Sequence, residues 1–164
     1  MNKKALVVLL ACLVFSVAGV MAQGRKAICI NEIMVQNDSN YVDDYGKHQA
    51  WIELFNSSFA PIDIASMYLT NDPSNPTMYP VPRMDVNTEI HPRQHVVFWA
   101  DGEPNKGTFH VNFVLTPGVE NWIGLYDADG KTLIDEVVIP ANLGDNQSYA
   151  RKSDGVKDAD NDAN

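Results

Sequence analysis

The sequence predicts an all-β domain, built as an antiparallel sandwich or barrel, and three observations support this class. From Ile28 onward the apolar residues recur with period two or in short runs of four to eight. Clusters of Asn, Asp, Pro and Gly separate these runs. No segment of this region keeps a helical apolar stripe over three turns. Many short strands at such spacing are typical of antiparallel sandwiches and barrels.

Nine strands are expected along the chain, each bounded by turn-forming residues. The sharpest local prediction is a hairpin at "YDADGKTL", because Asp129-Gly130 lies between two apolar segments and suits the positive φ of a tight turn. The expected strands are Ile28–Val35, Gln49–Asn56, Pro61–Leu69, Thr88–Ile90, His95–Trp99, Phe109–Leu115, Asn121–Tyr126, Thr132–Ile139 and Gln147–Arg151.

Residues 1–22 have the pattern of a secretory signal peptide. Two lysines precede an apolar run from Ala5 to Ala22, and polarity returns at Gln23. The run is short for a membrane span, and the small residue Ala22 suits signal peptidase. Cys12 is interpreted as part of the signal core rather than a lipidation site, because the apolar core continues for ten residues past it. We therefore expect an exported protein that begins at Gln23.

The composition of the remaining 142 residues limits the partners. This length suffices for one domain with its own core. Loss of Lys3 and Lys4 leaves ten Lys and Arg against 21 Asp and Glu, a net charge of −11. Such acidity disfavours binding to nucleic acid and to anionic membrane surfaces. Cys29 is then the only cysteine, so we expect a buried thiol and no internal disulfide.

Six segments in order carry a resemblance to a known family. They are "INEIMVQN", "WIELFNSS", "PIDIASMYLTND", "HVVFWADG", "HVNFVLTPGVENWIGLYDADGKTLIDEVVIP" and "QSYAR", spanning Ile28 to Arg151. Together they resemble the lamin tail domain, an immunoglobulin-like antiparallel β-sandwich that also occurs in secreted bacterial proteins. The resemblance implies a domain over residues 23–151, followed by an acidic polar tail or linker at 152–164.

The C-terminus departs from the family pattern. The family usually continues from "SYAR" through an Asp-Gly turn to a closing aromatic residue, whereas here no aromatic residue follows Tyr149. Either the last strand is absent or this chain is a fragment. The stretch from Asp154 onward has almost no apolar residue after Val156, which is typical of a solvated tail.

Two glutamates in apolar strands raise the question of a catalytic pair. Strand alternation places Ile52 and Leu54 in the core and Glu53 on the opposite face, towards solvent or the rim, with a lysine, hydroxyl or backbone partner on a neighbouring strand. Glu32 is in phase with the core positions and near the polar loop that starts at Gln36, from which it could accept hydrogen bonds. A glycosidase needs two carboxyl groups about 5 to 9.5 Å apart in one cleft. The resemblance implies motif positions without catalysis, so we predict structural roles and no catalytic residue.

No cofactor or metal site is predicted from the histidines. His91 and His95 are four residues apart, but Pro92 and a following strand prevent the convergence of a helical turn. His48 and His110 are isolated in the sequence. A Ser-His-Asp order, a Gly-rich phosphate loop and a nucleophile elbow are all missing from the sequence.

The tail has an incomplete calcium pattern. Asp158, Asp160 and Asp162 alternate as in a calcium loop, but Ala163 stands where a glycine should make the turn, and no bidentate Glu follows.

The loop "NDSNYVDDYGKH" allows two interpretations. It carries Asp38, Asp43, Asp44, Tyr41 and Tyr45 and is longer than a strand connection requires. It is either a solvated loop with its tyrosine rings packed back on the sheet, which we favour, or a binding loop on a rigid sandwich.

The aromatic strand residues leave a similar choice. Trp122 and Tyr126 share a face opposite Ile123 and Leu125. With Trp51 and Trp99 they either stack on sugars or cover an outer face against a neighbouring strand or domain. No binding residue is assigned.

Three function classes follow. The first is a noncatalytic protein-interaction or structural module on the periplasmic or extracellular face of the bacterial envelope, with a protein partner and without nucleic acid. A more specific form resembles the exported domain of decarboxylase sodium-pump gamma-like subunits, where a membrane helix would follow Asn164; residues 23–164 themselves are not expected to insert. The second class is a module that binds glycans or another ligand. The third is a hydrolase that uses Glu32 and Glu53.

Overall fold

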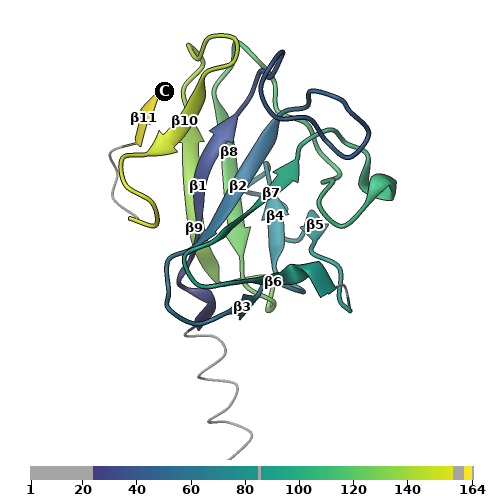
Figure 1. Cartoon of the computed structure of the whole chain (residues 1–164), viewed down its shortest axis with the longest axis vertical. Helices are drawn as coiled ribbons and strands as arrows, with labels where there is room; N and C mark the ends of the chain where they lie inside the picture. Colours follow the sequence, from purple (N-terminus) through teal and green to yellow (C-terminus); the bar gives the residue numbers. More distant parts are fainter. Residues whose placement is uncertain (1–23, 85, 157–160, 164) are drawn as a thin grey trace, which may run out of the picture.

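Two antiparallel sheets pack face to face in the computed structural model, which describes residues 24–84, 86–156 and 161–163 (Figure 1). The predicted signal peptide at 1–22 lies outside these residues. Among the described residues no helix has the length and apolar character needed to cross a membrane. The predicted all-β, immunoglobulin-like antiparallel sandwich is confirmed.

The first sheet has the strand order β11-β10-β1-β2-β7 and the second has the order β5-β4-β8-β9. A separate pair, β3 and β6, lies near one end of the sandwich (Figure 1). The strands are β1 (Ile28–Met34), β2 (Trp51–Asn56), β3 (Ile62–Asp63), β4 (Tyr68–Thr70), β5 (Tyr79–Pro80), β6 (Glu89–Ile90), β7 (His95–Trp99), β8 (Asn121–Tyr126), β9 (Leu133–Ile139), β10 (Ser148–Arg151) and β11 (Asn161–Ala163). Two 3-10 turns, η1 (Val86–Thr88) and η2 (Pro104–Lys106), interrupt the connections.

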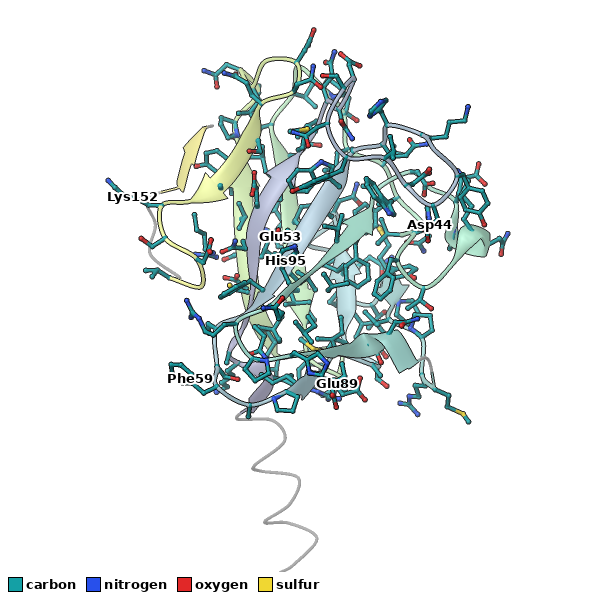
Figure 2. All side chains as sticks on the ribbon, viewed as in Figure 1. Asp44, Glu53, Phe59, Glu89, His95 and Lys152 are labelled. Atoms are coloured by element: carbon teal, nitrogen blue, oxygen red, sulfur yellow. The ribbon has the colours of Figure 1, made fainter. Side chains whose placement is uncertain are left out.

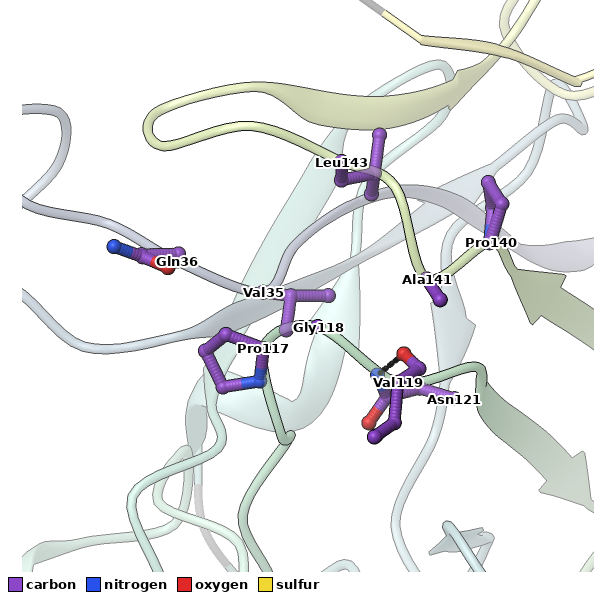
Figure 3. A pocket seen from close by; sticks show the side chains of 9 residues that line it. All are labelled: Val35, Gln36, Pro117, Gly118, Val119, Asn121, Pro140, Ala141 and Leu143. Atoms are coloured by element: carbon purple, nitrogen blue, oxygen red, sulfur yellow. Dashed lines mark hydrogen bonds between the residues drawn. The ribbon is translucent and has the colours of Figure 1, made fainter.

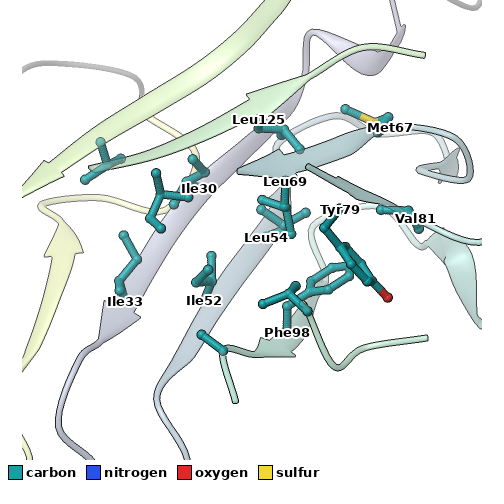
Figure 4. Packing of buried hydrophobic residues seen from close by; sticks show 14 of the residues in the cluster. Ile30, Ile33, Ile52, Leu54, Met67, Leu69, Tyr79, Val81, Phe98 and Leu125 are labelled. Carbon is teal, nitrogen blue, oxygen red and sulfur yellow. The ribbon is translucent and has the colours of Figure 1, made fainter. Parts of the chain in front are cut away.

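The core lies between the two sheets and is built from alternating strand positions (Figure 4). Ile52 and Leu54 of β2 are fully buried there, as their spacing predicted. They meet residues of the second sheet such as Leu69 and Leu125. The thiol of Cys29 is also buried, as expected. The sandwich therefore closes around an apolar core without a disulfide among the described residues.

The predicted hairpin joins β8 to β9. The amide of Asp127 donates to the carbonyl of Thr132 at 2.9 Å, and Gly130 has φ +64°. The Asp129 carboxylate accepts hydrogen bonds from the backbone amides of Lys131 and Thr132, both at 2.8 Å. The positive φ that the Asp-Gly pair favours is thus used in this turn.

A bulge in β1 is held by a buried ion pair between the two sheets. The register against β2 shifts between Ile30 and Glu32, so Asn31 is the extra residue. The amide of Ile30 donates to Asp135 Oδ2 at 2.8 Å, and Arg151 Nε donates to the Ile30 carbonyl at 2.7 Å. Arg151 also forms a bidentate pair with Asp135, at 2.9 and 2.8 Å. The buried side chains of Asp135 and Arg151 thereby provide hydrogen-bond partners for the amide and the carbonyl of Ile30 next to the bulge.

Two expected strands differ from the structure. Pro61–Leu69 divides into β3 and β4, because its two halves join different sheets. Phe109–Leu115 keeps alternating burial from Val111 onward but forms only isolated pairings, Trp99 with His110 and Asp101 with Val114. Side-chain amides replace the ladder there: Asn112 Nδ2, for example, donates to the Met78 carbonyl at 2.8 Å. This segment bridges the edges of the two sheets.

The chain continues past Arg151 along the first sheet. Residues 152–156 turn back over the first sheet, where the Gly155 amide donates to Asn31 Oδ1 at 3.1 Å. Arg151 Nη1 donates to the Val156 carbonyl at 2.9 Å. Beyond them β11 pairs with β10 as an edge strand. A strand therefore closes this edge without the aromatic residue of the family pattern, since backbone pairing needs no particular side chain.

Candidate functional site

Glu32 and Glu53 lie opposite each other on the outer face of the first sheet. The bulge at Asn31 reverses the alternation of β1, so Glu32 leaves the core phase and pairs in register with Glu53. The sequence-based expectation of Glu32 in phase with the core was wrong for this reason. The structure brings together two carboxyl groups that simple alternation had separated.

Glu53 is buried, which corrects the expected position towards solvent or the rim. Only 8% of the residue is exposed, although it faces away from the core. Its Oε1 accepts a hydrogen bond from Asn31 Nδ2 at 2.8 Å, and its Oε2 lies 3.8 Å from His95 Nε2 (Figure 2). Asn31 Nδ2 also donates to Asp154 Oδ1 at 3.1 Å, in the segment that folds back over the sheet. An amide and an imidazole, rather than a lysine, hydroxyl or backbone group, are its partners.

The surroundings raise the pKa of Glu53. Burial is the main cause, and the hydrogen bond from Asn31 and the charge of His95 oppose it. The charges of Glu32 and Asp154 raise the pKa further. A carboxyl group with a raised pKa beside a second carboxylate is a feature of glycosidases. An acid that is 8% exposed beneath Asn31 gives a sugar little access, so this cluster fits a structural role better.

The long loop between β1 and β2 is fixed by its own polar side chains. Asn37 Nδ2 donates to the carbonyls of Tyr41 and Gln49, at 2.8 and 2.9 Å. The Tyr41 ring packs on Trp51 with centroids 5.6 Å apart, and Tyr45 packs on His110 at 5.9 Å. Both tyrosine residues nevertheless remain 57% exposed. The rings pack back on the sandwich as favoured, yet each keeps a surface that a partner could contact.

A polar cluster that the sequence did not reveal lies where this loop meets the end of β7. One ligand atom each of Asp43, Asp101 and His110 lies within 4.8 Å of the other two. Asp101 Oδ2 lies 2.9 Å from His110 Nδ1 and accepts from Lys106 Nζ at 3.0 Å. The Asp43 and His110 residues are 4% and 2% exposed. Among the described residues this is the group of side chains that could hold a metal ion.

The charges in this cluster are strongly coupled. Burial raises the pKa of Asp101, but hydrogen bonds from Lys106 and His110 outweigh it and leave the pKa lowered. The hydrogen bond to Asp101 is in turn the main cause of the raised pKa of Lys106, and the charge of Asp43 adds to it. Lys106 therefore acts as a countercharge for both carboxylates.

The remaining histidines do not converge on a common site. His91 Nδ1 lies 3.9 Å from Glu89 on the exposed surface, whereas His95 contacts Glu53. His48 Nδ1 lies 3.2 Å from the Tyr41 carbonyl. In the tail, Asp158 and Asp160 lie outside the described residues, and the Asp162 side chain is not described either, so the calcium pattern stays untested.

The tryptophans divide between the two outer faces. Trp51 and Trp99 pack with Met34 into a small cluster on the first sheet and are 1% and 9% exposed. Trp122 and Tyr126 share the outer face of the second sheet and are partly exposed, opposite the buried Ile123 and Leu125. Trp122 is fixed by a 2.9 Å hydrogen bond from Nε1 to Glu136. Its ring covers Gly124, where any Cβ would lie 2.4 Å from the ring.

A shallow hollow at one end of the sandwich is too small for a typical ligand site (Figure 3). It encloses about 200 Å³, including space open to solvent. Typical ligand pockets have about 300 to 1,000 Å³. Its apolar wall is formed by Val35, Pro117, Val119, Pro140 and Leu143.

Sequence reasoning missed the roles of Asn31, Asp101 and Arg151. All three lie at the end of a strand or in a bulge, and the partners of Asn31 and Arg151 come from other strands. A signal existed for Asp101, which follows the apolar run "VVFWA" directly and precedes His110 by nine residues. The two meet only because residues 102–109 fold back along the end of β7.

The fold and these networks define a class of protein, the immunoglobulin-like β-sandwich modules in which polar motif residues support the fold. The particular family follows from a comparison with family models. The chain belongs to the lamin tail domain family, whose model matches residues 22–141. A search of curated proteins finds no match to this chain. The resemblance noted in the sequence is thereby confirmed, and folds of this family are typically noncatalytic.

Proposed function

We propose that this protein is a noncatalytic interaction or structural module that is exported to the periplasmic or extracellular face of the bacterial envelope. The observation that carries the proposal is that the polar motif residues are engaged in contacts within the sandwich. Glu53 is occupied by Asn31 and His95, and Arg151 is occupied by Asp135 and Ile30. These groups hold the sandwich together and leave its loops and sheet edges as the functional surfaces.

Export is supported by the N-terminal sequence. The apolar run from Ala5 to Ala22 follows Lys3 and Lys4 and ends at a small residue. A protein partner is supported by the loop at 37–48, which is held rigid while Tyr41, Val42 and Tyr45 are each at least 50% exposed. Aromatic residues on rigid loops are a common feature of protein interfaces.

A finer form of the proposal is the exported-side domain of a membrane subunit similar to decarboxylase sodium-pump gamma subunits. It requires a membrane helix encoded beyond Asn164. This form predicts stoichiometric membrane subunits among the partners, and a soluble protein that ends near Asn164 would contradict it.

The first experiment is to isolate the native protein from detergent-solubilised envelopes of its own organism with an antibody against the domain. Mass spectrometry then identifies its own termini and its partners, with a cytoplasmic fraction as the control. The proposal expects a chain that begins near Gln23 and a stoichiometric protein partner. A protein found in the cytoplasm with residues 1–22 intact would overturn the export. An exported protein without any stoichiometric partner would overturn the interaction role.

Glycan binding is the second candidate, and the outer face of the second sheet favours it. Trp122 and Tyr126 are partly exposed on that face, and the Trp122 ring lies over Gly124. Stacking of a sugar should quench tryptophan fluorescence. Titration with soluble envelope polysaccharide, compared with Trp122→Ala, tests this candidate; equal signals from both proteins would reject it.

The hypothesis of a hydrolase that uses Glu32 and Glu53 has its own test. Glu32→Gln and Glu53→Gln should each abolish turnover of a glycoside substrate if the glutamates are catalytic. The structural role predicts that neither variant loses an activity, because the wild-type protein has none.

A further inference from the structure

We propose that Asp43, Asp101 and His110 form a site for a divalent cation of the zinc class, which joins the loop at 37–48 to the end of β7. The inference goes beyond the proposed interaction role and does not depend on it. It starts from three side chains that two separate parts of the chain bring together.

The first observation is an unsatisfied carboxylate oxygen. Asp43 Oδ1 accepts hydrogen bonds from the amides of Tyr45 and Lys47, at 2.9 and 2.7 Å. Its other oxygen, Oδ2, is buried and has no hydrogen-bond partner in the described structure. A buried carboxylate oxygen without a partner is costly, and a metal ion is one of the groups that satisfy it.

The second observation is the composition of the cluster. Two carboxylates and one imidazole offer two oxygen ligands and one nitrogen ligand within 4.8 Å of one another. Zinc accepts both ligand types at about 2.0 to 2.2 Å, and three protein ligands leave a fourth position for water. The imidazole favours zinc and its neighbours over magnesium and calcium, which prefer oxygen ligands.

The third observation concerns charge. Asp43 and Asp101 together carry two negative charges, and the Lys106 ammonium supplies one positive charge 3.0 Å from Asp101 Oδ2. A divalent cation with a neutral imidazole would balance both carboxylates. The competing explanation for the cluster is a hydrogen-bonded ion network without metal, in which His110 supplies the second positive charge.

The Lys106 ammonium contacts the Asp101 oxygen that a metal ion would bind, and its side chain is exposed enough to move away into solvent. Its side chain is 26% exposed, whereas those of Asp101 and His110 are 2% and 3% exposed. It belongs to the short turn η2 at the surface. Binding of zinc would displace the ammonium from Asp101 into solvent, and any proton on the ligating ring nitrogen of His110 would pass to the buffer.

The test is calorimetric titration of the EDTA-treated, dialysed full-length protein with Zn²⁺ alone. The wild type should bind one ion that Asp43→Asn weakens by about 100-fold, since loss of a ligand exceeds the 10- to 100-fold effect of an outer partner. Asp44→Asn is the matched control, because it removes the same charge from an exposed neighbour, and it should change the affinity less than about threefold. Lys106→Gln should tighten binding at least about tenfold, because a competing positive charge is removed.

Co²⁺ provides a second readout, since ligation by nitrogen and oxygen side chains changes its visible absorption. The spectrum should shift with wild type and with Lys106→Gln but not with His110→Gln. Near-ultraviolet circular dichroism checks the fold of each variant. If Asp43→Asn fails to fold, Lys106→Gln still decides the question. Absent binding in the wild type, unchanged or weaker binding in Lys106→Gln, or equal losses in the Asp43 and Asp44 variants would each overturn the site and favour the ion network.

Discussion

Arg151→Met should destabilise the sandwich more than any surface change, because this side chain joins both sheets. Arg151 donates two hydrogen bonds to Asp135 of β9, one to the carbonyl of Ile30 in β1 and one to Val156. Its side chain is 4% exposed and that of Asp135 is 8% exposed. Methionine is unbranched and fills the space of the aliphatic part of arginine, so the loss is mainly that of the guanidinium and its interactions.

The magnitude follows from what the variant leaves behind. Removing one partner of a buried ion pair costs about 3 to 5 kcal/mol, because the other charge stays buried without compensation. The Ile30 carbonyl also loses its arginine donor. A domain of this size is stable by roughly 5 to 15 kcal/mol, so the variant should lose a large part of its stability. We expect a fall in Tm of roughly 10 to 20 °C.

Urea unfolding followed by tryptophan fluorescence measures the loss. Arg83→Met is the matched control, since Arg83 is exposed, and it should stay within about 0.5 kcal/mol of wild type. The double variant with Asp135→Asn should lose less than the sum of the single variants, because the uncompensated charge is gone. A loss below about 1 kcal/mol for Arg151→Met, or additive losses in the double variant, would refute the assigned role.

Three further outcomes are expected. Burial raises the pKa of Glu53, so the folded state favours the protonated acid, and its contribution to stability is lost as pH rises through the folded pKa. Glu53→Gln, which keeps an acceptor for Asn31, should therefore gain stability relative to wild type in urea unfolding as pH rises above 4.5, the ordinary value for glutamate. A variant that is less stable than wild type at neutral pH would contradict the burial argument. Gly130→Ala should cost about 1 to 2 kcal/mol, because φ is +64° at this turn, and an unchanged Tm would show that the turn adapts. Tyr79, whose pKa burial raises to about 12, should titrate last in an ultraviolet pH titration. Tyr79→Phe should remove that titration step and lower the free energy of unfolding by about 0.5 to 1.5 kcal/mol, because the 2.6 Å hydrogen bond to the Thr108 carbonyl is lost. Titration of Tyr79 near pH 10 would refute the effect of burial.

Local chemistry made much of the fold predictable. The alternation that places Ile52 and Leu54 in the core depends only on the pleat of an extended strand. The Asp129-Gly130 hairpin depends on a turn conformation that glycine adopts readily. The resemblance carried by six short segments then selected the immunoglobulin-like sandwich among all-β folds. These features are encoded by neighbouring residues, so the sequence was sufficient to predict them.

The candidate sites depended on contacts that sequence order does not reveal. A single extra residue at Asn31 reversed the face of Glu32 and placed it opposite Glu53. The outer face of β2 is buried only because distant segments fold over it, so Glu53 is not at the surface.

The sequence by itself determined the strand pattern, the acidic charge and the export signal that we predict, because each is a property of local residue order. Only the tertiary structure decided which polar groups meet. Asp43, Asp101 and His110 are separated by 58 and 9 positions in the chain. They converge because the loop at 37–48 and the segment that returns along β7 lie together beside the end of that strand. A register shift of one residue, or a loop that folds back, changes which polar side chains are neighbours. The order of apolar residues in the sequence is the same in either case.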